Sequence, residues 1–196
     1  MWEIEAEIRN TGISCICGVD EAGRGPLAGP VFAAAVILPF GIKIHGLNDS
    51  KKLTEKKREE LYNIITAKAI SYAVAFASHN EIDEINILNA TYLAMNRAIK
   101  ALSTEPEISL IDGNRSSGIL YNNRCITGGD GKSASIAAAS ILAKVSRDKY
   151  MTDIAGQYPA YLFEKHKGYG TKLHYEKLKE FGPSEIHRST FLKKMH

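Results

Sequence analysis

The feature that most constrains the fold of this chain is an alanine-rich segment, residues 133–150. Helix-favouring residues fill the segment, and its centre, Ala137-Ala-Ala-Ser140, carries only small side chains. A helix without bulky side chains on one face can lie close against a β-sheet. Residues 133–150 therefore predict a helix that packs closely on a sheet formed by other parts of the chain.

Short apolar segments with β-branched or alternating residues predict the strands of that sheet: residues 13–19, 30–38, 71–78, 108–111 and 124–127. Apolar residues at helical spacing predict further helices at 55–69, with Thr54 as N-cap, and at 87–102 and 172–180. Strands dominate the first part of the chain and then alternate with helices. This order favours an α/β fold with a mixed central sheet flanked by helices.

The composition predicts one globular domain, because 44% of the 196 residues are hydrophobic and 24% are charged. The longest apolar run, residues 31–40, is about half the length of a bilayer-spanning helix, and the acidic start is untypical of a signal peptide. We expect no membrane association. The three cysteines, Cys15, Cys17 and Cys125, have neither disulfide nor metal-site spacing, so we expect buried thiols in a reducing cytoplasm.

Positive charge is concentrated in the last third of the chain. Residues 131–196 carry 12 basic and 6 acidic side chains, whereas residues 1–130 carry 13 basic and 16 acidic ones. This asymmetry is typical of a surface that binds a polyanion such as nucleic acid, although a solvated helical surface has the same composition. The candidates for phosphate contacts are Lys51, Lys52, Lys144, Lys172, Lys177, Lys179, Arg188, Lys193 and Lys194.

Two glycine motifs resemble nucleotide-binding loops but lack a required glycine. Gly131-Lys-Ser133 resembles the end of a P-loop, yet the glycine that should precede it is replaced by Ile126. In Gly23-Arg-Gly25, the third glycine of a dinucleotide fingerprint is replaced by Ala28. The sequence therefore argues against both kinds of nucleotide site.

Four carboxylates follow strands or precede the alanine-rich helix: Asp20, Glu21, Asp112 and Asp130. Carboxylate oxygens are hard ligands, and their mutual repulsion is relieved by a divalent cation such as Mg²⁺ or Mn²⁺. Adjacent strand residues point to opposite faces, so Asp20 and Glu21 share a site only if the strand breaks there. Ala22-Gly23 favours such a break.

The segment Gly18-Val-Asp-Glu-Ala-Gly-Arg-Gly-Pro-Leu-Ala-Gly-Pro30 resembles the signature of the ribonuclease HII family, the type 2 ribonucleases H. Further segments match in the expected order between residues 18 and 188: Asn48–Leu53, Ile111–Gly113, Gly129–Asp130, Ala137–Val145, Arg147–Asp148, Lys167–Thr171 and His187–Arg188. The resemblance implies an RNase H-like fold with a C-terminal helical extension. Residues 151–196 would form this basic, substrate-binding part of a single catalytic domain.

The resemblance also implies an endoribonuclease that acts on RNA–DNA hybrids and on ribonucleotides embedded in duplex DNA, leaving 3′-hydroxyl and 5′-phosphate ends. Carried over by position, Asp20, Glu21, Asp112 and Asp130 would be the catalytic, metal-binding acids of a two-metal site. Asp148 competes for the fourth place, but it lies roughly 20 Å along the helix from Ser133 at about 1.5 Å per residue. We expect Asp148 to be a surface or salt-bridged residue of the helix, beside Arg147, instead.

Substrate-binding roles carried over from the family fall on the glycine loop and on one tyrosine. Gly23, Arg24 and Gly25 would approach the ribonucleotide through their main chain, and Tyr169 would contact the next nucleotide. Arg24 as a surface cation and Tyr169 as a structural loop residue are the alternatives. His187 matches a family position, but we derive no role for it beyond a cap or a core residue.

Two rival interpretations remain at this level. Ribonuclease HIII is a sister family with an additional N-terminal domain and a lysine in its glycine loop, where this chain has Arg24. A catalytically silent duplex-binding module on the same fold is the other rival, which the four intact acids oppose. We expect a monomeric, cytoplasmic enzyme whose partners are hybrid and ribonucleotide-containing duplexes.

Overall fold

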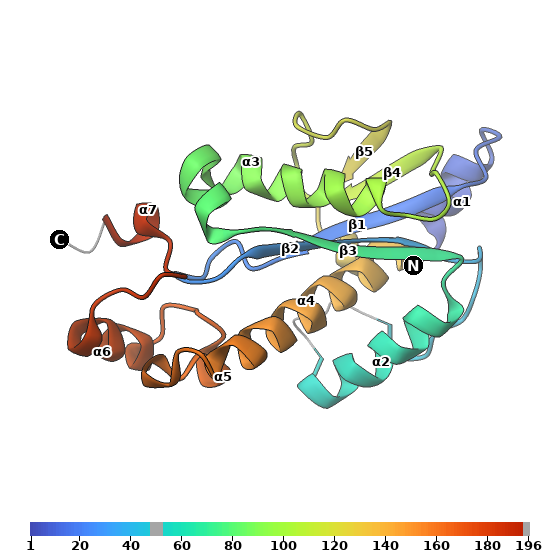
Figure 1. Cartoon of the computed structure of the whole chain (residues 1–196). Helices are drawn as coiled ribbons and strands as arrows, with labels where there is room; N and C mark the ends of the chain where they lie inside the picture. The colour runs from blue at the N-terminus through green and yellow to red at the C-terminus, as the bar shows by residue number, and fades with distance from the viewer. Residues whose placement is uncertain (48–52, 194–196) are drawn as a thin grey trace.

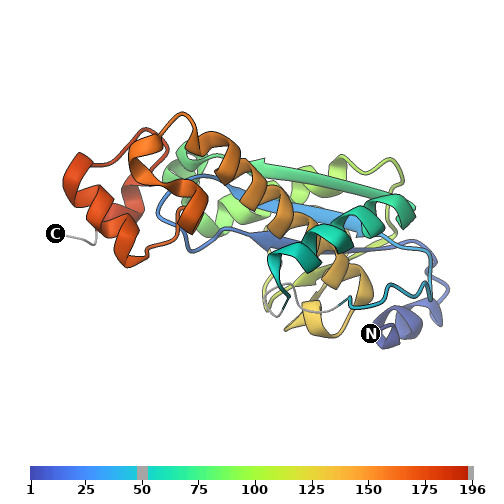
Figure 2. The same cartoon turned by 90° about the horizontal axis from the view of Figure 1, so that it is seen from below.

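The computed structural model describes residues 1–47 and 53–193, which build one five-stranded mixed sheet with helices on both faces (Figures 1 and 2). The strand order is β3-β2-β1-β4-β5. β1 is antiparallel to β2 and parallel to β4, as the predicted mixed sheet requires. The strands are β1 (Ile16–Ala22), β2 (Val31–Ile37), β3 (Ser71–Ala77), β4 (Ile108–Asp112) and β5 (Asn123–Ile126).

The helices divide between the two faces of the sheet and a C-terminal extension. α3 covers one face, α2 and α4 cover the other, and the last three helices lie beyond one end of the sheet (Figures 1 and 2). The helices are α1 (Glu3–Arg9), α2 (Glu55–Lys68), α3 (His79–Lys100), α4 (Ala134–Ala155), α5 (Phe163–His166), α6 (Lys172–Phe181) and α7 (Ser189–Leu192). Among the described residues, no helix combines the length and apolarity that a bilayer crossing demands.

The alanine-rich helix α4 packs directly on β1, as its small side chains predict. A Cβ atom added to Gly18 of β1 would lie 2.1 Å from the main-chain carbon of Ser135, so only glycine fits there. Ala137, Ala138 and Ala139 are fully buried. Main chain therefore contacts main chain where α4 crosses the central strand, and this contact fixes the start of α4 relative to β1.

Several predicted boundaries differ from the structure, among them the first strand, predicted at 13–19 and observed at Ile16–Ala22, and the alanine-rich helix, which runs to Ala155. Two differences have identifiable reasons. α3 begins at His79 rather than near residue 87, because Ser78 and Glu81 form a capping box at its start. Asn86, with φ 67°, interrupts this long helix, and the predicted segment begins just after that kink. The predicted break at Asp20-Glu21 is wrong, since β1 continues to Ala22.

The C-terminal extension has its own small core and is tied to the glycine loop. Phe163 and Met151 are fully buried in this core beside Leu27 and Ala28 of the loop. A single bridge pairs Ala28 with His187, and the Leu27 amide donates to the Gly168 carbonyl oxygen at 2.8 Å. The loop thus lies between the sheet and the extension.

The cysteines only partly match the expectation of burial. Cys17 is fully buried on β1, whereas Cys15 and Cys125 are half-buried at the edge of the core. Cys15 precedes β1, and Cys125 lies on the edge strand β5, where one side lacks a neighbouring strand. All three are free thiols, as predicted.

Candidate metal centre and substrate loop

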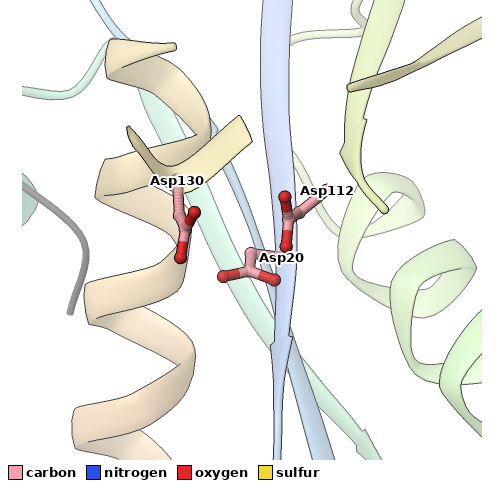
Figure 3. A group of neighbouring side chains, drawn as sticks. All are labelled: Asp20, Asp112 and Asp130. Carbon is pink, nitrogen blue, oxygen red and sulfur yellow. The ribbon is translucent and has the colours of Figure 1, made fainter. Parts of the chain in front are cut away.

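Three of the four predicted acids meet at one edge of the sheet. Asp20 lies near the end of β1, Asp112 ends β4, and Asp130 lies in a short 3₁₀ turn, Gly129–Gly131, just before α4. Each offers a carboxylate oxygen, and these atoms lie within 4.8 Å of one another. Figure 3 shows the three carboxylates pointing toward one another from these separate elements.

Local backbone geometry brings these acids together. β1 and β4 are parallel and pair Val19 with Ile111, so the residues that follow each pair end at the same edge of the sheet. The Gly129 amide donates to Asp112 Oδ1 at 2.7 Å, which holds the turn carrying Asp130 against the end of β4. A Cβ on Gly129 would lie 2.5 Å from Ile136 Cδ1, so a side chain there would displace the end of the Ile136 side chain.

A buried residue of α1 supports the turn from the other side. Glu5 is only 1% exposed, and its Oε1 accepts from the Ser133 hydroxyl at 2.6 Å and from the Ser135 amide at 3.1 Å. The Ser133 hydroxyl in turn accepts from the Ile136 amide and caps α4. Sequence analysis missed this contact because 128 residues separate Glu5 from Ser133.

The electrostatics of the cluster favour a bound cation. Asp20 is 4% exposed, and its pKa is raised well above its ordinary value, first by burial and then by the charges of Glu21 and Asp112. A hydrogen bond from Ser140 of α4 opposes this rise. Three converging carboxylates, one of them destabilised as an anion, form a donor set that suits a hard divalent cation. The residues present therefore fit the expected metal.

Glu21 lies beside this group and not within it. Because β1 continues through Glu21 and pairs it with Ala33, its side chain leaves the opposite face of the strand from Asp20. Its Oε1 lies 3.3 Å from Arg24 Nη1. Glu21 nevertheless faces the same cavity of about 210 Å³, which is lined by Asp20, Glu21, Ala22, Gly23, Arg24, Asp112, Ser140, Lys144 and Tyr169.

The cavity thus collects predicted substrate residues next to the acids. A Cβ on Gly25 would meet no described atom within 4 Å, so the main chain there is open to a ligand. Tyr169 is 38% exposed, and Lys144 Nζ lies 5.5 Å from the centroid of its ring. Lys144 also pairs with Asp148 at 2.8 Å, so Asp148 is salt-bridged, one of the two roles that we considered for it, and lies outside the group of three acids.

The side chains predicted to bind phosphate lie in different environments. Arg188 is 0% exposed and donates only to main-chain carbonyl oxygens, so the prediction of a phosphate contact there is wrong. Lys172, Lys177, Lys179 and Lys193 lie on the extension, where the Lys172 side chain is 93% exposed. Lys51, Lys52 and Lys194 lie outside the described residues.

Three histidines form a buried cluster behind Tyr169 that sequence analysis did not predict. His166, His174 and His187 are at most 6% exposed. His166 and His174 stack with ring centroids 4.3 Å apart, and His174 Nδ1 lies 2.9 Å from the Tyr169 carbonyl oxygen. His187 is therefore a core residue, one of the two roles that we considered for it.

Comparisons with known proteins agree on one family. The family model described as Ribonuclease HII matches residues 17–194. A ribonuclease HII of Caldicellulosiruptor bescii is 58% identical over 192 residues, covering 98% of this chain and 93% of the relative. One from Clostridioides difficile is 51% identical over 189 residues, covering 96% and 74%.

Solved structures give the same fold. Ribonuclease H2 from Pyrococcus horikoshii is similar with a TM-score of 0.73 and 27% identity, over 90% of this chain and 93% of that one. The Archaeoglobus fulgidus enzyme, solved as a PCNA:RNase HII complex, has a TM-score of 0.72 and 25% identity, over 90% and 94%. A Bst-RNase HIII in complex with Mn²⁺ shares the fold at 19% identity and a TM-score of 0.70, over 92% and 68%.

Proposed function

The chain belongs to the ribonuclease HII family, and from this membership we propose that it also cuts at single ribonucleotides embedded in duplex DNA. As a family member it is a metal-dependent endonuclease of the ribonuclease H class that hydrolyses the RNA strand of RNA–DNA hybrids. The observation that carries the finer proposal is that Asp20 and Asp112 of the three-acid group line one cavity together with Gly23 and Arg24 of the glycine loop.

Asp20, Asp112 and Asp130 would hold two divalent cations, with Glu21 contributing from the other face of β1. When bound, such ions activate the attacking water and stabilise the leaving oxygen, which gives 3′-hydroxyl and 5′-phosphate ends. Ser140 orients the Asp20 carboxylate, and the Gly129 amide orients that of Asp112. These two contacts fix the carboxylates before any substrate arrives.

The loop 23–25 would recognise the ribose. A 2′-hydroxyl distinguishes RNA from DNA, and a main chain without side chains can approach it closely. Gly25 provides that open main chain, and Arg24 is exposed beside it. Tyr169 would stack on the sugar that follows, while Lys144, beside its ring, would contact phosphate.

The proposal is tested with three duplexes of equal length: one with a single ribonucleotide, one RNA–DNA hybrid and one of DNA only. We expect cleavage of the first two with Mg²⁺ or Mn²⁺, a 5′-phosphate at each cut, and no cleavage with excess EDTA. Comparing the rates with the two metals identifies the preferred ion. The proposal is contradicted if the single-ribonucleotide duplex stays intact at every metal concentration tested.

We also propose that the enzyme acts as a monomer in the cytoplasm. Asp20, Asp112 and Asp130 meet within a single copy of the chain, and the three free thiols suit a reducing compartment. Light scattering during size-exclusion chromatography, with and without a hybrid duplex, tests the oligomeric state. A dimer in the active complex would contradict it.

A further inference from the structure

Two arginines with no part in the proposed chemistry are completely buried beside the glycine loop. Arg147 on α4 and Arg188 before α7 are each 0% exposed. Among the described residues, no ion pair joins either guanidinium to a carboxylate, and burial lowers the pKa of Arg188 to about 9. Burying a cation in this way is costly unless its donors are satisfied, so their hydrogen bonds identify what they hold.

Within residues 1–47 and 53–193, every side-chain hydrogen bond of the two arginines ends on a main-chain carbonyl oxygen. Arg188 donates to Gly23 at 2.7 Å, Arg24 at 3.0 Å, Gly29 at 2.8 Å and Pro30 at 3.2 Å. Arg147 donates to Ala28 at 3.3 Å, Pro30 at 3.1 Å and Lys167 at 3.0 Å. Five of these six acceptor residues belong to segment 23–30, so the two side chains bind both ends of the glycine loop.

The fit leaves no freedom at the first glycine. Gly23 has φ +98°, and a Cβ there would lie 2.0 Å from Arg147 Nε. The guanidinium therefore fills the space that any side chain at position 23 would need. A planar guanidinium spreads five donors over three nitrogens and can bind carbonyl oxygens that lie apart, whereas the three donors of lysine sit on a single nitrogen.

The same guanidinium connects the loop to Tyr169. Arg147 donates to the Lys167 carbonyl oxygen, and its Cζ lies 5.5 Å from the Tyr169 ring centroid. The Leu27 amide donates to Gly168, the residue before Tyr169. Segments 23–30 and 167–169 are thus fixed to each other, although about 140 residues of chain separate them.

We propose that Arg147 and Arg188 are positioning residues that set the shape of the glycine loop and its distance from Tyr169, and so determine how well the enzyme recognises a ribonucleotide. This inference rests on the proposed role of that loop. Neither arginine faces the cavity that collects the acids, so both act through main-chain groups and not on the substrate.

The experiment compares Arg188→Lys and Arg147→Lys with the wild-type protein by hydrogen exchange and by kinetics. Lysine keeps the charge, so it is less disruptive than an apolar substitution. We expect the amides of Leu27 and Gly29 to exchange roughly 10- to 150-fold faster, the range for losing one hydrogen bond to a charged group. We expect kcat/KM on the single-ribonucleotide duplex to fall roughly 100-fold, as for a site displaced by about 1 Å. We also expect both variants to lose preference for that duplex over all-DNA duplex in binding.

Two control variants separate positioning from general stability. Tyr161→Phe removes a 2.7 Å hydrogen bond to the Gly182 carbonyl oxygen, an acceptor of the same extension that is not part of the loop. Arg97→Lys makes the same substitution on α3, where Arg97 donates to the Phe76 carbonyl oxygen. We expect both controls to keep wild-type loop exchange and wild-type preference for the single-ribonucleotide duplex over all-DNA duplex in binding.

The inference is overturned if loop exchange is unchanged in both arginine variants, or if the controls show the same exchange and the same loss of preference. If one arginine variant does not fold, the other supplies the measurement, because each binds the loop through its own carbonyl oxygens. Exchange does not depend on catalysis. A wild-type enzyme that ignores ribonucleotides would therefore contradict the proposed function and leave the exchange result to test the positioning of the loop.

Discussion

The Nε2 atoms of His174 and His187 face each other at 3.0 Å inside the C-terminal extension. The Tyr169 carbonyl oxygen can only accept, so His174 Nδ1 donates to it and His174 Nε2 accepts from His187. His187 Nδ1 then accepts from the Ser184 amide at 2.8 Å. A proton added to either ring would place two N–H groups against each other, so the pair is stable only when both rings are neutral.

This pair predicts a loss of stability in weak acid. Burial is the main cause that lowers the pKa of both His174 and His187 to about 4. Unfolded histidines titrate near 6.5, so between about pH 6.5 and pH 4 the unfolded chain binds protons that the folded protein does not. As the pH decreases through this range, the free energy of unfolding should decrease by about 1.4 kcal/mol per pH unit for each histidine. Urea titration at several pH values measures this change.

Two substitutions identify the source of this acid sensitivity. His174→Gln should make the pH dependence shallower because one titrating ring is removed. His45→Gln should leave it unchanged because that side chain is exposed. An unaltered slope in His174→Gln would assign the effect to other groups.

Asp112→Asn should reduce cleavage to background while the protein stays folded. An amide oxygen can still accept from Gly129, and one charge leaves a repulsive cluster, so the Tm in EDTA should equal or exceed that of the wild type. Mg²⁺ should raise the wild-type Tm more than that of the variant, because the ion binds only the intact site. Asp153→Asn, an exposed acid on α4, is the matched control. Wild-type rates for Asp112→Asn would refute the assignment.

Tyr169→Ala should lose more activity on a single embedded ribonucleotide than on a continuous hybrid. An aromatic ring packs best on a sugar without a 2′-hydroxyl, and stacking contributes about 1–3 kcal/mol, which corresponds to a loss of roughly 5- to 150-fold. Tyr169→Phe keeps the ring and should keep most of the activity, whereas Asp130→Asn should depress both substrates alike. Equal losses for Tyr169→Ala on the two substrates would make Tyr169 a structural residue of its loop.

The basic side chains of the extension should contribute to duplex affinity through salt-dependent binding of phosphates. Lys172→Gln and Lys179→Gln should each reduce the slope of log Kd against log salt by about 0.9 for every phosphate that the lysine neutralises. Lys100→Gln, an exposed lysine on α3, should not change it. Deleting all residues after Glu180 is a poorer test because it also removes Arg188 from the glycine loop. Unchanged slopes in both variants would show that α6 is not part of the duplex-binding surface.

Glu5→Ala should destabilise the protein even though Glu5 lies outside the part of the chain that matches the family model. The substitution leaves the Ser133 hydroxyl and the Ser135 amide without their acceptor, which costs about 1–3 kcal/mol, or roughly 2–12 °C in Tm. Glu3→Ala changes an exposed acid of the same helix and should have little effect. A Glu5→Ala protein as stable as Glu3→Ala would show that α1 does not support the start of α4.

The parts of the fold that sequence predicts are those set by local patterns. Apolar alternation indicates β3 to within one residue, and Thr54 marks the start of α2 because its side chain caps the Lys57 amide. The family resemblance and the enzyme class it implies are confirmed by the comparisons. The meeting of Asp20, Asp112 and Asp130 follows from the parallel pairing of β1 and β4, which strand ends indicate but do not specify.

The parts that sequence does not predict depend on contacts between distant segments. Local sequence indicates that Arg188 is a basic surface residue, yet 165 residues separate it from its acceptor Gly23. α1 is seven residues long, too short to be stable alone, and is held by contacts such as that of Glu5 with Ser133. The start of α3 is an exception, because it is missed although its signal is local: the Ser78–Glu81 capping box marks it, and apolar spacing, which places the helix at 87–102, does not include that signal.

The contact of Gly18 with Ser135 has a consequence for how far the acids can move. Main-chain atoms have no rotamers, so the separation between β1, which carries Asp20, and the start of α4, which follows Asp130, cannot change through side-chain rearrangement. Thermal motion of side chains therefore leaves the spacing of these carboxylates nearly constant up to the temperature at which α4 detaches from the sheet. Heat should end catalysis abruptly at unfolding and not by gradual loosening of the site.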